Sequence, residues 1–274
     1  MTITATGTIS LGDLRTEFVG GSAAISFGDL YRGGSNIRKL ATDNTAVNDA
    51  ASVPTSGVID FDDFYGSAKS FTKTYSAGAT DQDASTIFGT DYSVDYPKNI
   101  VIDSGVELGA TSASQEALQI DAGGAGTITI TNNGTLSGAG GAAGAAGGDA
   151  FEADVTCTFI NNGTVRAGGG GGGTGGNGSY TYAQSLGPSN QMPQTCSTQY
   201  LNSKCVQQYG SGAYCTGNCQ KVGDDYRCTQ CSRNQTAYSN GGAGGVGKGY
   251  NQSASSGSSG GSNPGSGGTG GSYG

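Results

Sequence analysis

The stretch TVRAGGGGGGTGGNGS, residues 164–179, contains a run of six glycines and, after Thr174, three more glycines within four residues. Such a stretch is either a flexible linker or a structural element made of glycine, and this choice decides the fold. Glycine loses more conformational freedom on ordering than any other residue. An ordered tract therefore needs neighbours that compensate for this entropy.

A repeat of 29 residues argues against a linker. TITITNNGTLSGAGG, from Thr127, aligns with TCTFINNGTVRAGGG, from Thr156. Each copy alternates apolar and polar residues, which predicts a strand, and continues with an Asn-Gly pair that favours a hairpin turn. A short strand and a glycine tract follow. Since a linker has no reason to recur behind the same motif, we expect the tracts to be ordered.

Four glycine tracts begin near residues 138, 168, 241 and 257. A glycine helix with three residues per turn has no internal hydrogen bonds, but several such helices can approach closely and bond to one another. We therefore predict a mainly β fold with an extended bundle of polyglycine-II-type helices. Disorder is the alternative, above all for residues 253–274, because Gly/Ser-rich sequence is typical of flexible linkers.

The first 70 residues carry an irregular repeat whose copies are ISLGDL, ISFGDL and IDFDDF, beginning at Ile9, Ile25 and Ile59. In each copy a Ser or Asp is followed three residues later by Asp, the spacing of a capping box, which predicts a short helix. Such short helices are not stable alone. We interpret residues 1–70 as a docking module of short capped helices and strands. A plain small-domain core is the alternative.

The rest of the chain divides by composition. Residues 71–137 are predicted to be β-rich and solenoid-like, because NIVIDSGVELG from Asn99 and ALQID from Ala117 alternate. Residues 138–274 form a glycine-rich tip domain that includes a Cys/Tyr-rich loop, residues 179–240. The first 154 residues hold 19 of the 21 acidic side chains, which supports a boundary near residues 120–155.

The loop has too few large aliphatic side chains for a core, so covalent staples are expected. Cys157 matches Ile128 in the repeat and is predicted to be a buried core thiol, which leaves an even six cysteines. Three disulfides would suit a loop exposed outside the cell. A four-thiolate zinc site from CTGNC and CTQC is the alternative. The disulfide candidates are Cys196, Cys205, Cys215, Cys219, Cys228 and Cys231.

Tyrosines are frequent in the same loop, and tyrosine gives rigid amphipathic contact area at low entropic cost. Basic side chains among them can meet phosphate or carboxylate groups. We predict that the loop binds a surface; the alternative is that the tyrosines only pack the loop onto itself. The candidate binding residues are Tyr180, Tyr182, Tyr200, Tyr209, Tyr214, Tyr226, Arg227 and Arg233.

Composition also excludes several classes of function. Histidine is absent, which removes Ser-His-Asp and Cys-His catalysis and every histidine metal site. Asp224 and Asp225 are adjacent and would point apart on a strand, and Asp149, Glu152 and Asp154 have no evident partner, so we expect no glycan-cleaving enzyme. We expect no cofactor and no metal site. Because the net charge is −8 and the basic residues are dispersed, we also expect no nucleic-acid partner. No secretory signal or membrane insertion is expected either.

Strand motifs leading into glycine tracts, with long loops between the tracts, resemble the distal receptor-binding adhesins of tailed bacteriophages of the T-even type. The resemblance implies a virion protein on the phage tail, exposed outside the host cell, whose loops bind a surface receptor, either an outer-membrane protein or a glycan. Residues 1–70 differ from the N-terminal part of those adhesins, and as a docking module they are expected to attach to another phage tail or fibre protein. The cysteine-rich loop departs from that pattern. The alternative is a structural glycine-rich virion or extracellular protein that binds nothing.

Overall fold

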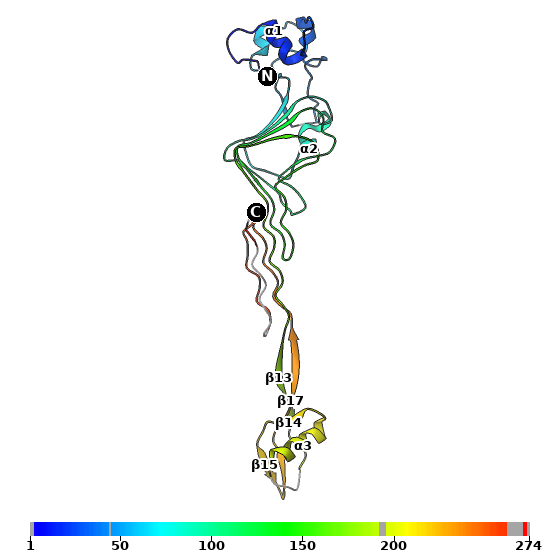
Figure 1. The fold of residues 1–274 in the computed structure, drawn as a ribbon, viewed down its shortest axis with the longest axis vertical. Coiled ribbons are helices and arrows are strands. Elements are labelled where there is room, and N and C mark those ends of the chain that lie inside the picture. Colours follow the sequence, from blue (N-terminus) through cyan, green and yellow to red (C-terminus); the bar gives the residue numbers. More distant parts are fainter. Residues whose placement is uncertain (1–2, 44, 192–195, 262–270, 273–274) are drawn as a thin grey trace. The chain divides into compact units, whose positions relative to one another are not determined.

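The computed structural model describes residues 3–43, 45–191, 196–261 and 271–272 (Figure 1). The chain divides into two compact units. Unit 1 contains residues 1–173, 245–256 and 269–274, and unit 2 contains residues 174–244 and 257–268. Most of the fourth glycine tract, residues 262–270, lies outside the described residues. No helix in the described part of the chain is long and apolar enough to cross a membrane.

The three predicted capped helices are confirmed in the N-terminal module. They are α1 (Leu11–Leu14), η2 (Phe27–Leu30) and η3 (Phe61–Phe64), and all three have the predicted capping box. A turn of π-helix, η1 (Arg15–Val19), continues α1. The last apolar residue of each repeat points into one shared core, where Leu14, Leu30 and Phe64 are fully buried.

Strands β2 to β12 form a parallel β-solenoid of about three turns, which confirms the mainly β prediction. Its first sheet has the order β1-β2-β5-β8-β11, its second β12-β9-β6-β3 and its third β10-β7-β4. The first sheet contains β1 (Val47–Asn48), β2 (Phe71–Tyr75), β5 (Lys98–Ile102), β8 (Ile128–Asn132) and β11 (Thr158–Asn161). The second contains β3 (Ala79–Thr80), β6 (Glu107–Gly109), β9 (Thr135–Ser137) and β12 (Thr164–Arg166). The third contains β4 (Gln82–Asp83), β7 (Leu118–Ile120) and β10 (Phe151–Ala153).

The 29-residue repeat is the rise from one turn of the solenoid to the next. Ile130 pairs with Phe159, and Leu136 pairs with Val165, both in parallel. Alternate residues of each strand point inward, so β8 buries Ile128 and Ile130. Equivalent residues of the two repeat copies are therefore neighbours in adjacent turns of the solenoid.

The predicted Asn-Gly hairpins are wrong. Strands β8 and β9 flank Asn133-Gly134 but pair with different strands, β8 with β5 and β11, and β9 with β6 and β12. Neither Asn133 nor Gly134 has the positive φ that a two-residue hairpin turn requires. The pair instead forms a solenoid corner. The Asn162 side chain of the next turn donates to the Asn133 side chain at 3.0 Å, because equivalent corners stack.

A short helical segment and a buried lysine stabilise the loops that connect the solenoid strands. Helix α2 (Ala84–Phe88) and the 3-10 turn η4 (Gly89–Asp91) bury Ile87 and Phe88 against the strands. Lys98 is fully buried at the start of β5. Its ammonium donates to the carbonyls of Val94 at 2.7 Å, Tyr96 at 3.0 Å and Ala125 at 2.7 Å. Burial lowers the pKa of Lys98 to about 8.

The last turn of the solenoid is less covered than the others. Cys157, predicted as a buried core thiol, is a free thiol that is only half-buried. Val165 stays 40% exposed, whereas its neighbour Leu136 in the preceding turn is fully buried. The difference arises because β11 and β12 pair with a solenoid strand on one side only.

The glycine tracts of unit 1 run side by side and contain neither α-helix nor β-strand (Figure 1). The amides of Gly138, Gly141 and Gly144 donate to the carbonyls of Arg166, Gly169 and Gly172, each at 2.9 Å. The bonded residues are thus three apart on both segments. A further segment joins them, because Gly172 donates to Gly245 at 2.8 Å and Gly247 donates to Gly141 at 2.9 Å.

Unit 2 consists of an antiparallel ribbon and a disulfide-linked subdomain. The ribbon is formed by β13 (Gly178–Gly187) and β17 (Cys231–Ser239), which pair antiparallel. Strand β14 (Ala213–Cys215) pairs antiparallel with the first three residues of β17. The subdomain adds α3 (Thr198–Tyr209) and the hairpin of β15 (Cys219–Val222) and β16 (Asp225–Cys228).

Candidate functional site

Three disulfides tie the subdomain of unit 2 together. Cys205 of α3 is bonded to Cys231 at the start of β17, and Cys215 of β14 is bonded to Cys228 of β16. The third bond joins Cys196, directly before α3, to Cys219 of β15. Every element of the subdomain therefore contains at least one cysteine that forms a disulfide.

Disulfides take the place of a hydrophobic core in this subdomain. Its buried cluster contains Leu201, Ala213 and three cysteines that form disulfides. Polar contacts add to it: the Cys215 amide donates to the Asn202 side chain at 2.7 Å, and the Cys228 amide donates to Ser189 Oγ at 2.8 Å. So small a core could not order these residues alone.

The zinc alternative is not supported by the structure. Sulfur atoms of Cys205, Cys228 and Cys231 lie within 4.8 Å of one another, close enough to share a metal ion. All three belong to disulfides. A zinc site needs thiolates, which disulfide sulfurs cannot supply.

Some of the predicted binding residues are engaged within the subdomain. Tyr209, at the end of α3, donates its hydroxyl to the Pro188 carbonyl at 3.0 Å. Tyr214 donates to the Asn234 side chain at 2.6 Å, and Arg233 donates to the Tyr209 carbonyl. These three side chains hold the ribbon, β14 and α3 together.

Other predicted residues face outward. Tyr182 is 44% exposed and Tyr200 is 47% exposed. Tyr180 and Tyr182 are two residues apart on β13, and their ring centroids lie 6.0 Å apart. Tyr200 lies on α3, so the structure does not bring all the predicted tyrosines onto one strand.

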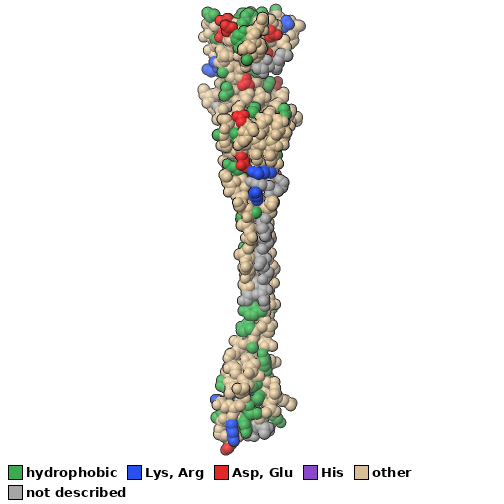
Figure 2. Space-filling model, turned by 90° about the vertical axis from the view of Figure 1, so that its left-hand side faces the viewer, with side chains coloured by type: hydrophobic (Ala, Val, Ile, Leu, Met, Phe, Trp, Pro, Cys, Tyr) green, Lys and Arg blue, Asp and Glu red, His purple; other side chains and the backbone are tan. Residues whose placement is uncertain are grey.

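The hairpin of β15 and β16 carries the remaining predicted residues. Arg227 donates through its guanidinium to Gln220 at 3.0 Å and 3.2 Å, across the two strands. The Tyr226 ring is half-buried against the disulfide core, with the Lys221 ammonium 6.0 Å from its centre. On the face shown in Figure 2, acidic side chains are concentrated over unit 1, whereas unit 2 shows mainly polar and hydrophobic side chains.

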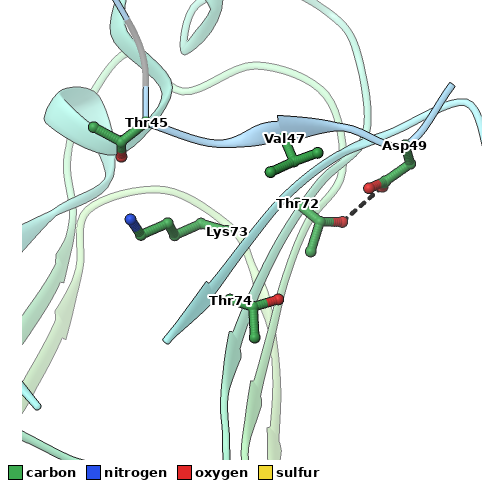
Figure 3. A pocket seen from close by; sticks show the side chains of 6 residues that line it. All are labelled: Thr45, Val47, Asp49, Thr72, Lys73 and Thr74. Carbon is green, nitrogen blue, oxygen red and sulfur yellow. Dashed lines mark hydrogen bonds between the residues drawn. The ribbon is translucent and has the colours of Figure 1, made fainter. Parts of the chain in front are cut away.

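A shallow hollow of about 340 Å³ lies beside β1 and β2 in unit 1 (Figure 3). Half of its lining residues are threonines, and Thr72 Oγ1 donates to the Asp49 carboxylate at 2.6 Å. The Lys73 ammonium lies 5.1 Å from the centre of the Tyr75 ring. The lining side chains are Thr45, Val47, Asp49, Thr72, Lys73 and Thr74. Asp49 is thus engaged in holding β2.

A pair of carboxyl groups on unit 1 was not predicted from the sequence. Asp83 caps α2, accepting from the Ser85 amide and hydroxyl at 2.7 Å, and it also shares a hydrogen bond with Asp121. Burial and the bond to Asp83 raise the pKa of Asp121 to about 6. Burial opposes ionisation of Asp83, but bonds from Asp121 and Ser85 hold its pKa below the usual value. Glycoside hydrolysis needs carboxyl groups about 5 Å or more apart on either side of a substrate, whereas these two are in direct contact.

Two further residues of the ribbon escaped the sequence prediction. Gln184 and Gln235 lie on the same face of the ribbon as Tyr182, since Tyr182 pairs with Gln235 and alternate residues share a face. Tyr238 is 82% exposed on the other face. The alternation in SYTYAQS, residues 179–185, is the signal that could have separated these two faces.

Unit 1 is a parallel solenoid whose chain continues into hydrogen-bonded glycine segments, and unit 2 carries a disulfide-linked subdomain with exposed tyrosines. A model of the phage tail fibre adhesin Gp38 family matches residues 70–274. The chain belongs to this family of phage tail fibre adhesins, which places it in the tail of the virion. Searches among curated proteins and among solved structures find no match.

Proposed function

We propose that the glycine segments of unit 1 form polyglycine-II-type helices packed into a bundle. The three-residue spacing of their bonds supports this, because such a helix has three residues per turn and directs equivalent amides to one side. The glycines that face a neighbouring segment have no room for a side chain. A Cβ atom on Gly168 or Gly247 would overlap the carbonyl of Ala139 or Gly169.

We infer that this bundle is the scaffold of an adhesin that binds a receptor on the host surface through unit 2. The observation that carries the proposal is the disulfide-linked subdomain. Three disulfides fix a segment with almost no hydrophobic core and leave aromatic side chains such as Tyr182 and Tyr200 exposed. A structural spacer would not need such a surface. Binding loops use tyrosine for this purpose.

The N-terminal module is proposed to attach the adhesin to another tail or fibre protein. Residues 1–70 lie almost entirely outside the matched family region, which begins at residue 70. Apolar side chains remain exposed on this module, with Val58 86% exposed and Phe61 36% exposed. If they form the attachment surface, Val58→Asp with Phe61→Asp should lower incorporation into particles while the purified protein still binds cells.

An adsorption competition tests the main proposal. The purified full chain, added to host cells first, should reduce phage adsorption. A variant in which residues 190–235 are replaced by a short Gly/Ser linker should lose this effect while unit 1 keeps its stability. This range includes residues 192–195, which lie outside the described part of the chain.

A spacer that binds nothing would give the opposite result. The wild-type protein would then leave adsorption unchanged at any concentration, although circular dichroism showed it folded. Particles carrying the replaced segment would adsorb as well as wild-type particles.

A further inference from the structure

The ribbon of unit 2 has two different faces. Because side chains alternate along a strand, Tyr180, Tyr182 and Gln184 of β13 share one face with Gln235 and Arg233 of β17. The other face carries small and polar side chains and Tyr238. The first face, defined by Tyr180, Tyr182, Gln184 and Gln235, is called here the aromatic–amide face.

We propose that the aromatic–amide face binds a linear, uncharged stretch of a host cell-surface glycan. The inference rests on the proposed function, because it names the class of receptor and the surface of unit 2 that binds it.

The chemistry of the face matches a sugar. Tyr180 and Tyr182 place two rings 6.0 Å apart along one strand. A pyranose ring has a face of C–H groups that packs on an aromatic ring, and hydroxyl groups around its edge. Gln184 and Gln235 offer amide groups beside the rings, and an amide both donates to and accepts from hydroxyls.

Charge supports an uncharged ligand. The two ribbon strands, residues 178–187 and 231–239, contain one charged side chain, Arg233. It donates to the Tyr209 carbonyl. No carboxylate lies on either ribbon strand. A phosphate-rich or acidic ligand would find little electrostatic attraction on this face, whereas a neutral hydroxyl-rich chain needs none.

The size of the face favours a chain over a globular partner. Eight residue pairs join β13 and β17 before the irregularity at Ser185. At about 3.3 Å per residue and about 10 Å for two strands, the face measures roughly 260 Å². A stable protein–protein interface covers about 800 Å² on each partner, which exceeds this face about threefold. A single polysaccharide strand fits within its width.

The test measures binding of the purified full chain to two targets from a host strain. One is the polysaccharide part of its lipopolysaccharide, purified free of protein, and the other is intact cells. Tyr180→Ala with Tyr182→Ala should lower affinity for the polysaccharide about tenfold to a hundredfold, at about threefold to tenfold per ring. Tyr182→Phe should retain binding, because the ring remains. Tyr238→Ala is the matched control, since this more exposed tyrosine lies on the other face. Near-UV circular dichroism checks that the disulfide-linked subdomain is intact in each variant.

Cell treatments identify the receptor class. Binding that survives proteinase treatment of the cells and disappears after periodate oxidation supports a glycan. If proteinase treatment abolishes binding to cells and the protein does not bind the polysaccharide, the glycan assignment is overturned. Receptor binding by unit 2 is then still supported. Equal affinity of the double variant and the wild type overturns the assignment to this face. Failure of the wild-type protein to bind cells at all would refute the proposed function itself.

Discussion

Gly171→Ala tests whether the glycine tracts are a packed structure. A Cβ atom at this position would overlap the Ala142 carbonyl oxygen, and it would lie 2.5 Å from the Ala142 carbonyl carbon and 3.0 Å from Ala143 Cα. Carbon atoms in contact are normally about 3.5–4.0 Å apart. The two segments would therefore have to move apart by about 1 Å.

Such a movement breaks neighbouring backbone bonds. The Gly171 amide donates to Ala145 at 2.8 Å, and the Gly144 amide donates to Gly172 at 2.9 Å. Lengthening by about 1 Å takes both beyond hydrogen-bonding distance. Two bonds at about 1 kcal/mol each, with about 1–3 kcal/mol for overpacking, give a local destabilisation of about 3–5 kcal/mol.

Gly173→Ala is the matched control, two residues away in the same tract. A Cβ atom there meets nothing within 4 Å, and the residue does not have a positive φ. Alanine reduces the freedom of the unfolded chain, so this variant should be more stable by about 0.4–1 kcal/mol. The two substitutions thus have opposite predicted signs although the tract sequence around them is nearly uniform.

Amide hydrogen exchange measured by mass spectrometry distinguishes the two variants. In Gly171→Ala, exchange in residues 138–148 and 167–173 should accelerate by a factor of about a hundred to a few thousand, whereas Gly173→Ala should exchange as slowly as wild type. The packing argument is refuted if the two variants exchange alike. It is also refuted if these residues of the wild-type protein exchange as rapidly as an unstructured peptide.

Three further predictions concern a buried lysine, a carboxyl group and a disulfide. Lys98→Met should lower the free energy of unfolding, measured in urea, by about 3–5 kcal/mol, because three buried carbonyls lose their donor. The wild type should also become more stable as the pH rises from about 8 toward 10, because the lowered pKa of Lys98 lets the folded state release this proton before the unfolded state does. The variant should not show this rise. The raised pKa of Asp121 means that its contribution to stability is present at low pH and lost as the pH rises through about 6, so the melting temperature of Asp121→Asn relative to wild type should be higher at pH 7.5 than at pH 4.5. Replacing Cys205 and Cys231 together by Ser should destabilise unit 2 by about 2–4 kcal/mol and expose α3 to proteolysis, with Cys157→Ser as the control that leaves unit 2 unchanged.

Local patterns in the sequence determined the small elements of this protein. Ser10 and Asp13 could be recognised as a capping box because both partners lie within one turn of a helix, and the structure forms the bond. The register of the solenoid followed from the 29-residue repeat, since Ile130 pairs with Phe159 as the alignment of the two copies predicts. An even number of cysteines in a segment without a core indicated disulfides.

Only the tertiary structure decided which elements meet. Asn133-Gly134 has the residues of a hairpin turn, but its two strands pair with other turns of the solenoid, because parallel stacking satisfies more backbone groups than an isolated hairpin. Lys98 is fully buried, and carbonyls from two separate loops accept its hydrogen bonds. The contact of Asp83 with Asp121 also joins residues far apart in the chain.

The division between the two faces of the ribbon shows the same limit within the candidate site. The sequence by itself determined that residues 179–240 are rich in tyrosine and cysteine, because composition is local information. It did not determine that Tyr209 and Tyr214 are engaged internally while Tyr180 and Tyr182 lie together on one face. That outcome depends on the pairing of β13 with β17 and on which cysteines form disulfides with each other. Such pairings join segments that are distant in the sequence, so the packing of the whole unit decides them.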